Sequence, residues 1–288
     1  MDHFQDKVAV VTGAASGIGL GMSEVFANMG MKVMMADVEQ APLMAESERL
    51  QKANLNVTPC LTDVSRQDQV ETLAERTIEQ YGKVHVLCNN AGVGGGGSPL
   101  WQSTDKDWEW QMGVNLMGVV HGLRAFVPLM LSHGEAGHIV NTSSIMGLAT
   151  GGGSIYSISK HAVTCLTEGL FFDLRVAKAN IGTSVLCPGL IATNIIKSGR
   201  NRPAELQNEA GDLDAQREMM ARAELMDTHF HQEGMNPLQV GEIVLDAIRK
   251  GRFYILTHPD NMELVKSRYG DIMANQAPSA SVFASAED

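Results

Sequence analysis

The chain has 288 residues, 44% of them hydrophobic, which is enough for a buried core and argues against disorder. Its 33 acidic and 22 basic residues give a net charge of −11 at pH 7, and such a surface disfavours nucleic acid as a partner. We expect no membrane span, because no run of 18 apolar residues occurs, and no signal peptide. The four cysteines are far apart without a CxxC pair, which favours free thiols and a cytoplasmic location. We expect no metal site, because His229 and His231 are two residues apart without a third ligand nearby.

The first predicted unit is a strand, a glycine turn and a helix. A β-branched strand over residues 7–12 runs into Gly13-Ala-Ala-Ser-Gly17-Ile-Gly19, and apolar residues then recur at helical spacing until Gly30. Glycines let the backbone approach a pyrophosphate closely, and the helix N-terminus behind them supplies unpaired N–H groups. We therefore predict a dinucleotide-binding turn; a tight turn without a ligand is the alternative.

The second strand, over residues 32–36, ends in Asp37. A carboxylate at this point of a dinucleotide site accepts hydrogen bonds from the adenosine ribose and repels a 2′-phosphate. Ser16 and Val38, which flank the expected phosphate position, are not basic. These observations favour NAD over NADP, with a surface acid that merely ends a strand as the alternative.

Strands and helices continue to alternate. The next predicted elements are a helix over 41–53, a strand over 56–64 that contains Asp63, a helix that Ser65 caps, and a strand over 84–88 that leads into Asn89-Asn90-Ala91-Gly92. Four repeats without a hairpin signal predict a parallel sheet with helices on both faces. Ligands of such sheets bind beyond the carboxyl ends of the strands, where these residues lie.

The second half keeps this order except in one region. It contains predicted helices over 108–118, 156–178, 237–250 and 261–275 and strands over 138–142, 182–187 and 253–258. Residues 194–236 are polar and rich in methionine, which suits either an adaptable pocket or ordinary core filling. Residues 277–288 form a small-residue tail. We see no second domain within 1–288.

Tyr156 and Lys160 are four residues apart, so a helix would place both on one face. An ammonium within roughly 4–6 Å favours the phenolate and lowers the tyrosine pKa from about 10 towards neutrality. The pair could therefore act as a general base. An exposed helix with the same spacing is the alternative.

These motifs, in this order, resemble the short-chain dehydrogenase/reductase family: Thr12 to Gly19, Asp63, Asn89 to Gly92 and Tyr156-x-x-x-Lys160. The resemblance implies a single Rossmann-type domain, with a doubly wound seven-stranded parallel sheet, that transfers a hydride between NAD and an alcohol or ketone. It disfavours a nucleotide-sugar epimerase, whose glycine spacing differs, and a non-catalytic dinucleotide sensor, which would lack the tyrosine or lysine.

The resemblance also implies the roles of individual residues. Tyr156 is the base, Lys160 lowers its pKa and bonds the nicotinamide ribose, and Asn115 in a kinked helix holds a relay water. The serine that positions the substrate oxygen is Ser144 by its Ser-x-x-Gly context, with Ser143, by its distance from Tyr156, as the alternative. The expected cofactor-binding residues are Gly13, Ser16, Gly17, Ile18, Gly19, Asp37, Asp63, Val64, Asn90, Ala91, Gly92, Tyr156, Lys160, Pro188, Gly189 and Thr193.

Partner and substrate expectations are coarser. The helix over 156–178 resembles the one through which family members form homodimers and homotetramers, although it could be buried within its own subunit. Residues 194–236 resemble the family's substrate lid. We expect a bulky, aryl-substituted alcohol as the substrate. Glycine-rich loops at 94–97 and 151–153 would leave room for it, and Trp101, Trp108 and Trp110 lie nearby in the sequence. The ending over 253–259 is also similar to that of bacterial aryl ether Cα-dehydrogenases. A steroid or other ring alcohol is the alternative.

Overall fold

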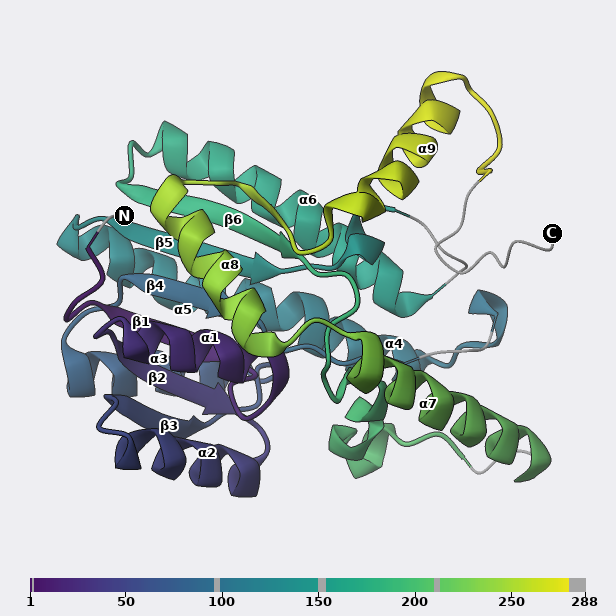
Figure 1. Cartoon of the computed structure of the whole chain (residues 1–288), viewed down its shortest axis with the longest axis horizontal. Coiled ribbons are helices and arrows are strands. Elements are labelled where there is room, and N and C mark those ends of the chain that lie inside the picture. Colours follow the sequence, from purple (N-terminus) through teal and green to yellow (C-terminus); the bar gives the residue numbers. More distant parts are fainter. Residues whose placement is uncertain (2, 96–98, 150–153, 210–212, 280–288) are drawn as a thin grey trace.

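The computed structural model describes residues 1, 3–95, 99–149, 154–209 and 213–279, with the backbone alone at 213–219 and 222. Its centre is a seven-stranded parallel sheet in the order β3-β2-β1-β4-β5-β6-β7 (Figure 1). The strands are β1 (Val8–Thr12), β2 (Lys32–Asp37), β3 (Val57–Leu61), β4 (Val86–Asn89), β5 (Gly137–Thr142), β6 (Ile181–Cys187) and β7 (Tyr254–Leu256). The predicted doubly wound parallel sheet is confirmed.

Helices cover both faces of the sheet because its strands are apolar on both sides. One face carries α1 (Gly17–Asn28), α2 (Gln40–Lys52) and α8 (Pro237–Lys250); the other carries α3 (Gln67–Tyr81), α5 (Gly118–His133) and α6 (Ile155–Val176). Within β1, Ala9 and Val11 belong to the first core, whereas Val10 belongs to the second. This alternation is the period of two expected for a strand.

The helix predicted over 108–118 is the start of a longer one. It comprises α4 (Asp105–Met112), a π-helical turn (Gly113–Met117) and α5. Within the described ranges this stretch, Asp105–His133, is the one helix long and apolar enough to cross a membrane. Its inner side chains Phe126 and Met130 are fully buried against the sheet. It is therefore a partly buried core helix.

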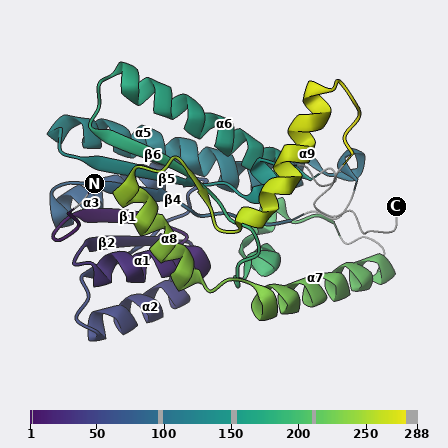
Figure 2. The same ribbon diagram turned by 45° about the horizontal axis from the view of Figure 1, so that its top comes forward.

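The segments after β6 and β7 extend past the carboxyl ends of the strands. They contain the long α7 (Leu213–Glu233) and α9 (Met262–Met273), which project on the same side of the molecule in both views (Figures 1 and 2). The short 3-10 turns are η1 (Leu100–Gln102), η3 (Ile145–Gly147), η4 (Ile195–Asn201), η5 (Ala204–Leu206) and η6 (Pro259–Asn261). The predicted lid over 194–236 thus contains η4, η5 and α7, and most of the predicted tail lies outside the described residues.

The prediction that Ser65 caps α3 is wrong. The helix begins at Gln67, and Arg66 stands in the capping position without a side-chain hydrogen bond. The backbone N–H and hydroxyl of Ser65 instead both donate to Asp63 Oδ1, at 2.9 and 2.7 Å. A carboxylate is a stronger hydrogen-bond acceptor than a neutral oxygen, so Ser65 bonds to Asp63 after β3 and does not cap α3.

Two glycines bring α1 and α8 into backbone contact. A Cβ on Gly21 would lie 2.2 Å from the carbonyl oxygen of Pro237, and one on Gly241 would lie 2.6 Å from that of Gly21. This close packing fixes α1, whose first turn follows the glycine-rich segment, against the sheet.

We expect Gly21→Ala to lower the free energy of unfolding by about 1–3 kcal/mol, because the added methyl overpacks the α1–α8 contact. Urea denaturation measures this change. The control is Gly270→Ala in α9, where a Cβ would meet no atom within 4 Å; it should leave stability unchanged or raise it by up to about 1 kcal/mol. Equal effects of the two substitutions would contradict the packing argument.

Candidate active site

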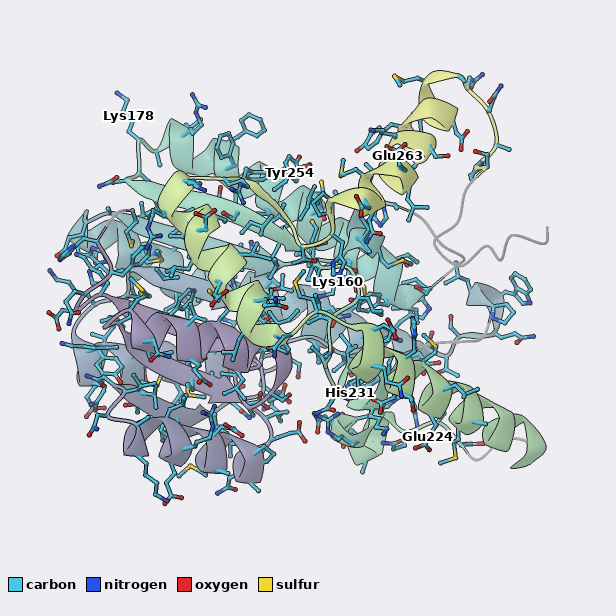
Figure 3. All side chains as sticks on the ribbon, in the orientation of Figure 1. Lys160, Lys178, Glu224, His231, Tyr254 and Glu263 are labelled. Atoms are coloured by element: carbon cyan, nitrogen blue, oxygen red, sulfur yellow. The ribbon has the colours of Figure 1, made fainter. Side chains whose placement is uncertain are left out.

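A cleft of about 490 Å³ lies at the carboxyl ends of the strands. The predicted residues that line it are Gly13, Ser16, Gly17, Ile18, Asp37, Asp63, Val64, Asn90, Ala91, Gly92, Ser143, Ser144, Tyr156, Lys160, Pro188, Gly189 and Thr193. Two predicted site residues, Gly19 and Asn115, are absent from its lining. Figure 3 shows Lys160 near the centre of the molecule, between the projecting helices α7 and α9.

The glycine turn owes its shape to close approaches of the backbone. Gly13 has a φ of +67°, and a Cβ there would lie 2.9 Å from Ala91 Cα. Gly19 acts by packing, since its Cβ would lie 2.0 Å from the Gly13 carbonyl oxygen. Ser16 forms no side-chain cap on α1, and the first turn of α1 holds no acid. The turn and the helix N-terminus therefore suit a pyrophosphate.

Asp37 lies at one end of this cleft. Its Oδ2 accepts a hydrogen bond from the N–H of Ala15, and its Oδ1 accepts one from the N–H of Glu39, each at 2.9 Å. Burial raises the pKa of Asp37 in spite of these two bonds. The carboxylate is thus fixed to the glycine turn and keeps further acceptor capacity for ribose hydroxyls. These residues fit a dinucleotide.

Side chains hold the strand ends together where the sheet hydrogen bonds stop. Thr12 Oγ1 accepts from the N–H groups of Asn90 and Ala91, at 2.9 and 3.0 Å. Asn90 Nδ2 donates to the Thr12 carbonyl oxygen, and Thr142 Oγ1 donates to Asn90 Oδ1. The ends of β1, β4 and β5 therefore form one rigid floor beneath the cleft.

Tyr156, Lys160 and Ser144 come together above β5. Lys160 is buried, and its Nζ donates to the Thr142 carbonyl oxygen at 2.9 Å. The same Nζ lies 5.6 Å from the centre of the Tyr156 ring. The predicted helix places the pair as its spacing indicates, in the first turns of α6.

The electrostatics differ from the expectation that Lys160 lowers the pKa of Tyr156. The residue Tyr156 as a whole is half-buried. Desolvation of its hydroxyl raises the pKa of Tyr156, and the nearby Ser144 opposes that rise. Burial also lowers the pKa of Lys160 from its ordinary 10.5 to about 8. In the cofactor-free chain, desolvation is the largest influence on the pKa of both groups.

The two candidate serines have different surroundings. Ser143 Oγ donates to the Lys160 carbonyl oxygen at 2.8 Å and shares a hydrogen bond with Thr164. Ser144 Oγ instead accepts a hydrogen bond from the Met146 N–H at 3.1 Å and lies near enough to Tyr156 to lower the pKa of its hydroxyl, and both serines line the cleft. A Cβ on Gly147 would lie 2.2 Å from Ser143 Oγ, which explains the glycine of the Ser-x-x-Gly motif. The loop over 150–153 lies outside the described residues.

Asn115 lies in the π-helical turn, a feature frequent at functional sites. Its Oδ1 accepts from the Val93 N–H at 2.8 Å, and its Nδ2 donates to the Val93 carbonyl oxygen and to Ser159 Oγ, each at 3.0 Å. The side chain therefore connects the turn to the segment after β4 and to α6. The predicted relay water stays a prediction.

The lining of the cleft also contains residues that sequence reasoning missed. The apolar ones are Val93, Val114, Ile191, Ile195, Leu206 and Phe230. Only Trp110 of the three tryptophans lines the cleft, whereas Trp101 is 85% exposed. The lid methionines with described side chains do not line it, and Met220 and Met226 are exposed. No periodicity of the sequence could have identified these residues, because they come from segments far apart in the chain.

Comparison with known proteins gives consistent matches. A family model described as short chain dehydrogenase matches residues 7–204. A CLA biosynthesis dehydrogenase/reductase from Lactiplantibacillus plantarum is 31% identical over 98% of this chain and 99% of its own, and a C alpha-dehydrogenase from a Sphingobium species is 32% identical over 96% and 89%. A short chain dehydrogenase/reductase from Burkholderia phymatum, solved with NAD, is 43% identical, with a TM-score of 0.93 over 99% of this chain and 100% of that one.

We expect Lys160→Met to raise the stability of the cofactor-free protein at pH 7 by about 2 kcal/mol. Lowering the lysine pKa to about 8 corresponds to about 3 kcal/mol of destabilisation, and losing the bond to Thr142 offsets about 1 kcal/mol. The destabilisation from burying the charged Lys160 is complete below the pKa of the folded state and absent above the pKa of the unfolded state. As the pH rises, the lysine loses its proton in the folded protein before it does so in the unfolded chain. The difference between variant and wild type should therefore shrink from pH 8 to about 10.5; a constant difference would contradict it.

The two serines should respond differently to alanine. Ser144→Ala should lower kcat for NADH formation by about 10²–10³-fold with little loss of stability, as for other donors to a reacting oxygen. Ser143→Ala should lower the free energy of unfolding by about 1–3 kcal/mol, because it removes a buried hydrogen bond of the Lys160 carbonyl. Steady-state kinetics and urea denaturation of both variants separate the effects. The reverse pattern would assign the role to Ser143.

Proposed function

The chain belongs to the short-chain dehydrogenase/reductase family, and we propose that it oxidises a bulky secondary alcohol with NAD, or reduces the corresponding ketone. As a family member it is an oxidoreductase that acts on CH–OH groups with a nicotinamide dinucleotide. The proposal depends on one observation: Tyr156, Ser144 and Lys160 meet in the same cleft as the glycine turn and Asp37.

In the proposed mechanism, Ser144 hydrogen-bonds the substrate oxygen and orients it towards Tyr156. Tyr156, as phenolate, removes the hydroxyl proton, and in ketone reduction it returns a proton as the phenol. Lys160 supplies positive charge beside the phenolate and a donor for the nicotinamide ribose, and Asn115 fixes the π-helical turn beside it. Bound NAD would supply the acceptor for the hydride of the carbinol carbon. The groups expected to hold it are the backbone of the glycine turn and the side chains of Asp37 and Thr193.

A preference for NAD over NADP is supported by the adenosine end of the cleft. Asp37 lies there, so a 2′-phosphate would approach its carboxylate, whereas the neighbouring Glu39 is paired with Arg200. Arg66, a basic residue at that end, pairs with Asp68 at 3.4 Å. The Burkholderia phymatum protein, solved with NAD, supports the same choice.

A bulky substrate is supported by the apolar residues in the lining of the cleft. Trp110 and Phe230 add aromatic surface to its aliphatic lining, which suits an aryl-substituted alcohol such as a benzylic one. The similarity to a C alpha-dehydrogenase points the same way. A steroid or other ring alcohol is the second candidate, because it would fill the same apolar space.

Assembly and location are part of the proposal. The outer side of α6 exposes Phe172 and Val176, with 64% and 85% of their surface accessible. Apolar residues in such a position favour contact with a second copy, as a homodimer or homotetramer in the cytoplasm.

A panel of benzylic, steroid and small aliphatic secondary alcohols tests this function by the absorbance of NADH. We expect turnover of a benzylic or ring alcohol, a lower KM for NAD than for NADP, and loss of at least about 10³-fold in kcat in Tyr156→Phe with NAD binding retained. Full activity of Tyr156→Phe would contradict the mechanism. Preference for a small aliphatic alcohol would contradict the size of the substrate, and a lower KM for NADP would contradict the role of Asp37.

A further inference from the structure

The segment that follows β6 crosses the carboxyl edge of the sheet and reaches the end of β2. In the strand order, β6 and β2 are separated by β5, β4 and β1. Strands lie about 4.8 Å apart, so the crossing covers about 19 Å. It passes over the glycine turn, since a Cβ on Gly17 would lie 2.9 Å from Thr193 Cγ2. The η4 residues Ile195, Ser198 and Asn201 line the cleft from this crossing segment.

A bidentate ion pair between Arg200 and Glu39 fixes the end of the crossing segment that lies nearest β2. Arg200 Nε donates to Glu39 Oε1 at 2.9 Å, and Arg200 Nη2 donates to Glu39 Oε2 at 2.5 Å. Glu39 lies two residues past Asp37 and lines the adenosine end of the cleft. The pair therefore joins the two walls between which a dinucleotide would lie.

Both partners are held in place for this contact. Arg200 Nη1 also donates to the carbonyl oxygens of Lys197 and Asn194, at 2.9 and 3.3 Å, which fixes the guanidinium against the backbone of η4. Hydrogen bonds from Arg200 and Asn201 hold the pKa of Glu39 below its ordinary value, so the carboxylate stays charged. Bidentate arginine–carboxylate pairs of this kind are stronger than ordinary surface pairs.

The other contacts of η4 lie on the substrate side. Ser198 Oγ accepts from the Gly94 N–H at 2.9 Å and donates to the Gly94 carbonyl oxygen at 3.0 Å. Lys197 pairs with the buried Asp227 of α7 at 2.7 Å. Breaking the contact with Glu39 would thus free one edge of the crossing segment while the opposite edge stays bound.

We propose that Glu39 and Arg200 form a clasp that closes η4 over the bound dinucleotide and must open before the cofactor leaves. The two are positioning residues: the clasp holds the segment that covers the pyrophosphate and nicotinamide positions and contributes nothing to proton transfer. This inference uses only the cofactor-binding part of the proposed function.

Stopped-flow fluorescence of NADH release tests the clasp in the full-length protein without any alcohol. Glu39→Gln and Arg200→Met should each release NADH about fivefold faster than wild type, with a similar loss of affinity by calorimetry. The double variant should be no faster than either single variant, because one interaction is lost in all three. Added salt should accelerate release from wild type and leave the variants nearly unchanged.

Arg49→Met provides the matched control. Arg49 is a similarly exposed arginine that pairs with Glu24 and Glu46, none of which lines the cleft. Its substitution should leave NADH release unchanged. A general loosening of the fold would accelerate release in this control too and would overturn the clasp.

Other outcomes separate the two proposals. Release rates within twofold of wild type in both single variants, or additive effects in the double variant, would overturn the clasp. Failure of wild type to bind NADH would overturn it as well. If wild type binds NADH and the variants release it faster, yet no alcohol is oxidised, the clasp is supported and the proposed function fails.

Discussion

The site depends on the buried ammonium of Lys160, which lies 5.6 Å from the centre of the Tyr156 ring. Burial favours the neutral form of each group: it raises the tyrosine pKa and lowers that of the lysine to about 8. In the cofactor-free chain, burial therefore opposes formation of the Tyr156 phenolate. Gly92 keeps space for the ammonium, since a Cβ there would lie 3.3 Å from Lys160 Nζ, and the Thr142 carbonyl gives it one acceptor. Such a cost is typical of residues retained for function rather than stability.

The parallel sheet explains why one cleft can hold all of these groups. Every strand ends at the same edge, so residues from six strand ends share one cavity. Hydrogen bonds of the Thr12 and Asn90 side chains join the ends of β1 and β4 beyond the last backbone hydrogen bonds of the sheet, and they give the cleft a fixed floor. The cover is built differently: η4 and α7 belong to no strand repeat and are held by ion pairs and side-chain contacts. A rigid floor under a cover held by breakable contacts suits a cofactor that must enter and leave.

Several differences between expectation and structure have one cause. Ser65 donates to a carboxylate that folding places beside it and so does not cap α3. Trp110 lines the cleft while Trp101 faces solvent, although both are large and aromatic. Met226, a methionine of the kind that suits an adaptable pocket, is instead 42% exposed. In each case, contacts with segments distant in the sequence determine where the side chain lies, and local sequence patterns cannot specify such contacts.

The sequence by itself determined the order of strands and helices, the glycine turn, Asp37 at the end of β2 and the register of Tyr156 with Lys160. These depend on spacings of a few residues and on the fixed geometry of helices and parallel strands. Only the tertiary structure shows how the surroundings of Ser143 and Ser144 differ, because the two are adjacent in the sequence and the hydrogen-bond partners of Ser143 come from α6. It likewise decided the direction of the pKa shift at Tyr156 and the contact between Glu39 and Arg200, 161 residues apart. Desolvation and long-range pairing arise only when the chain is folded.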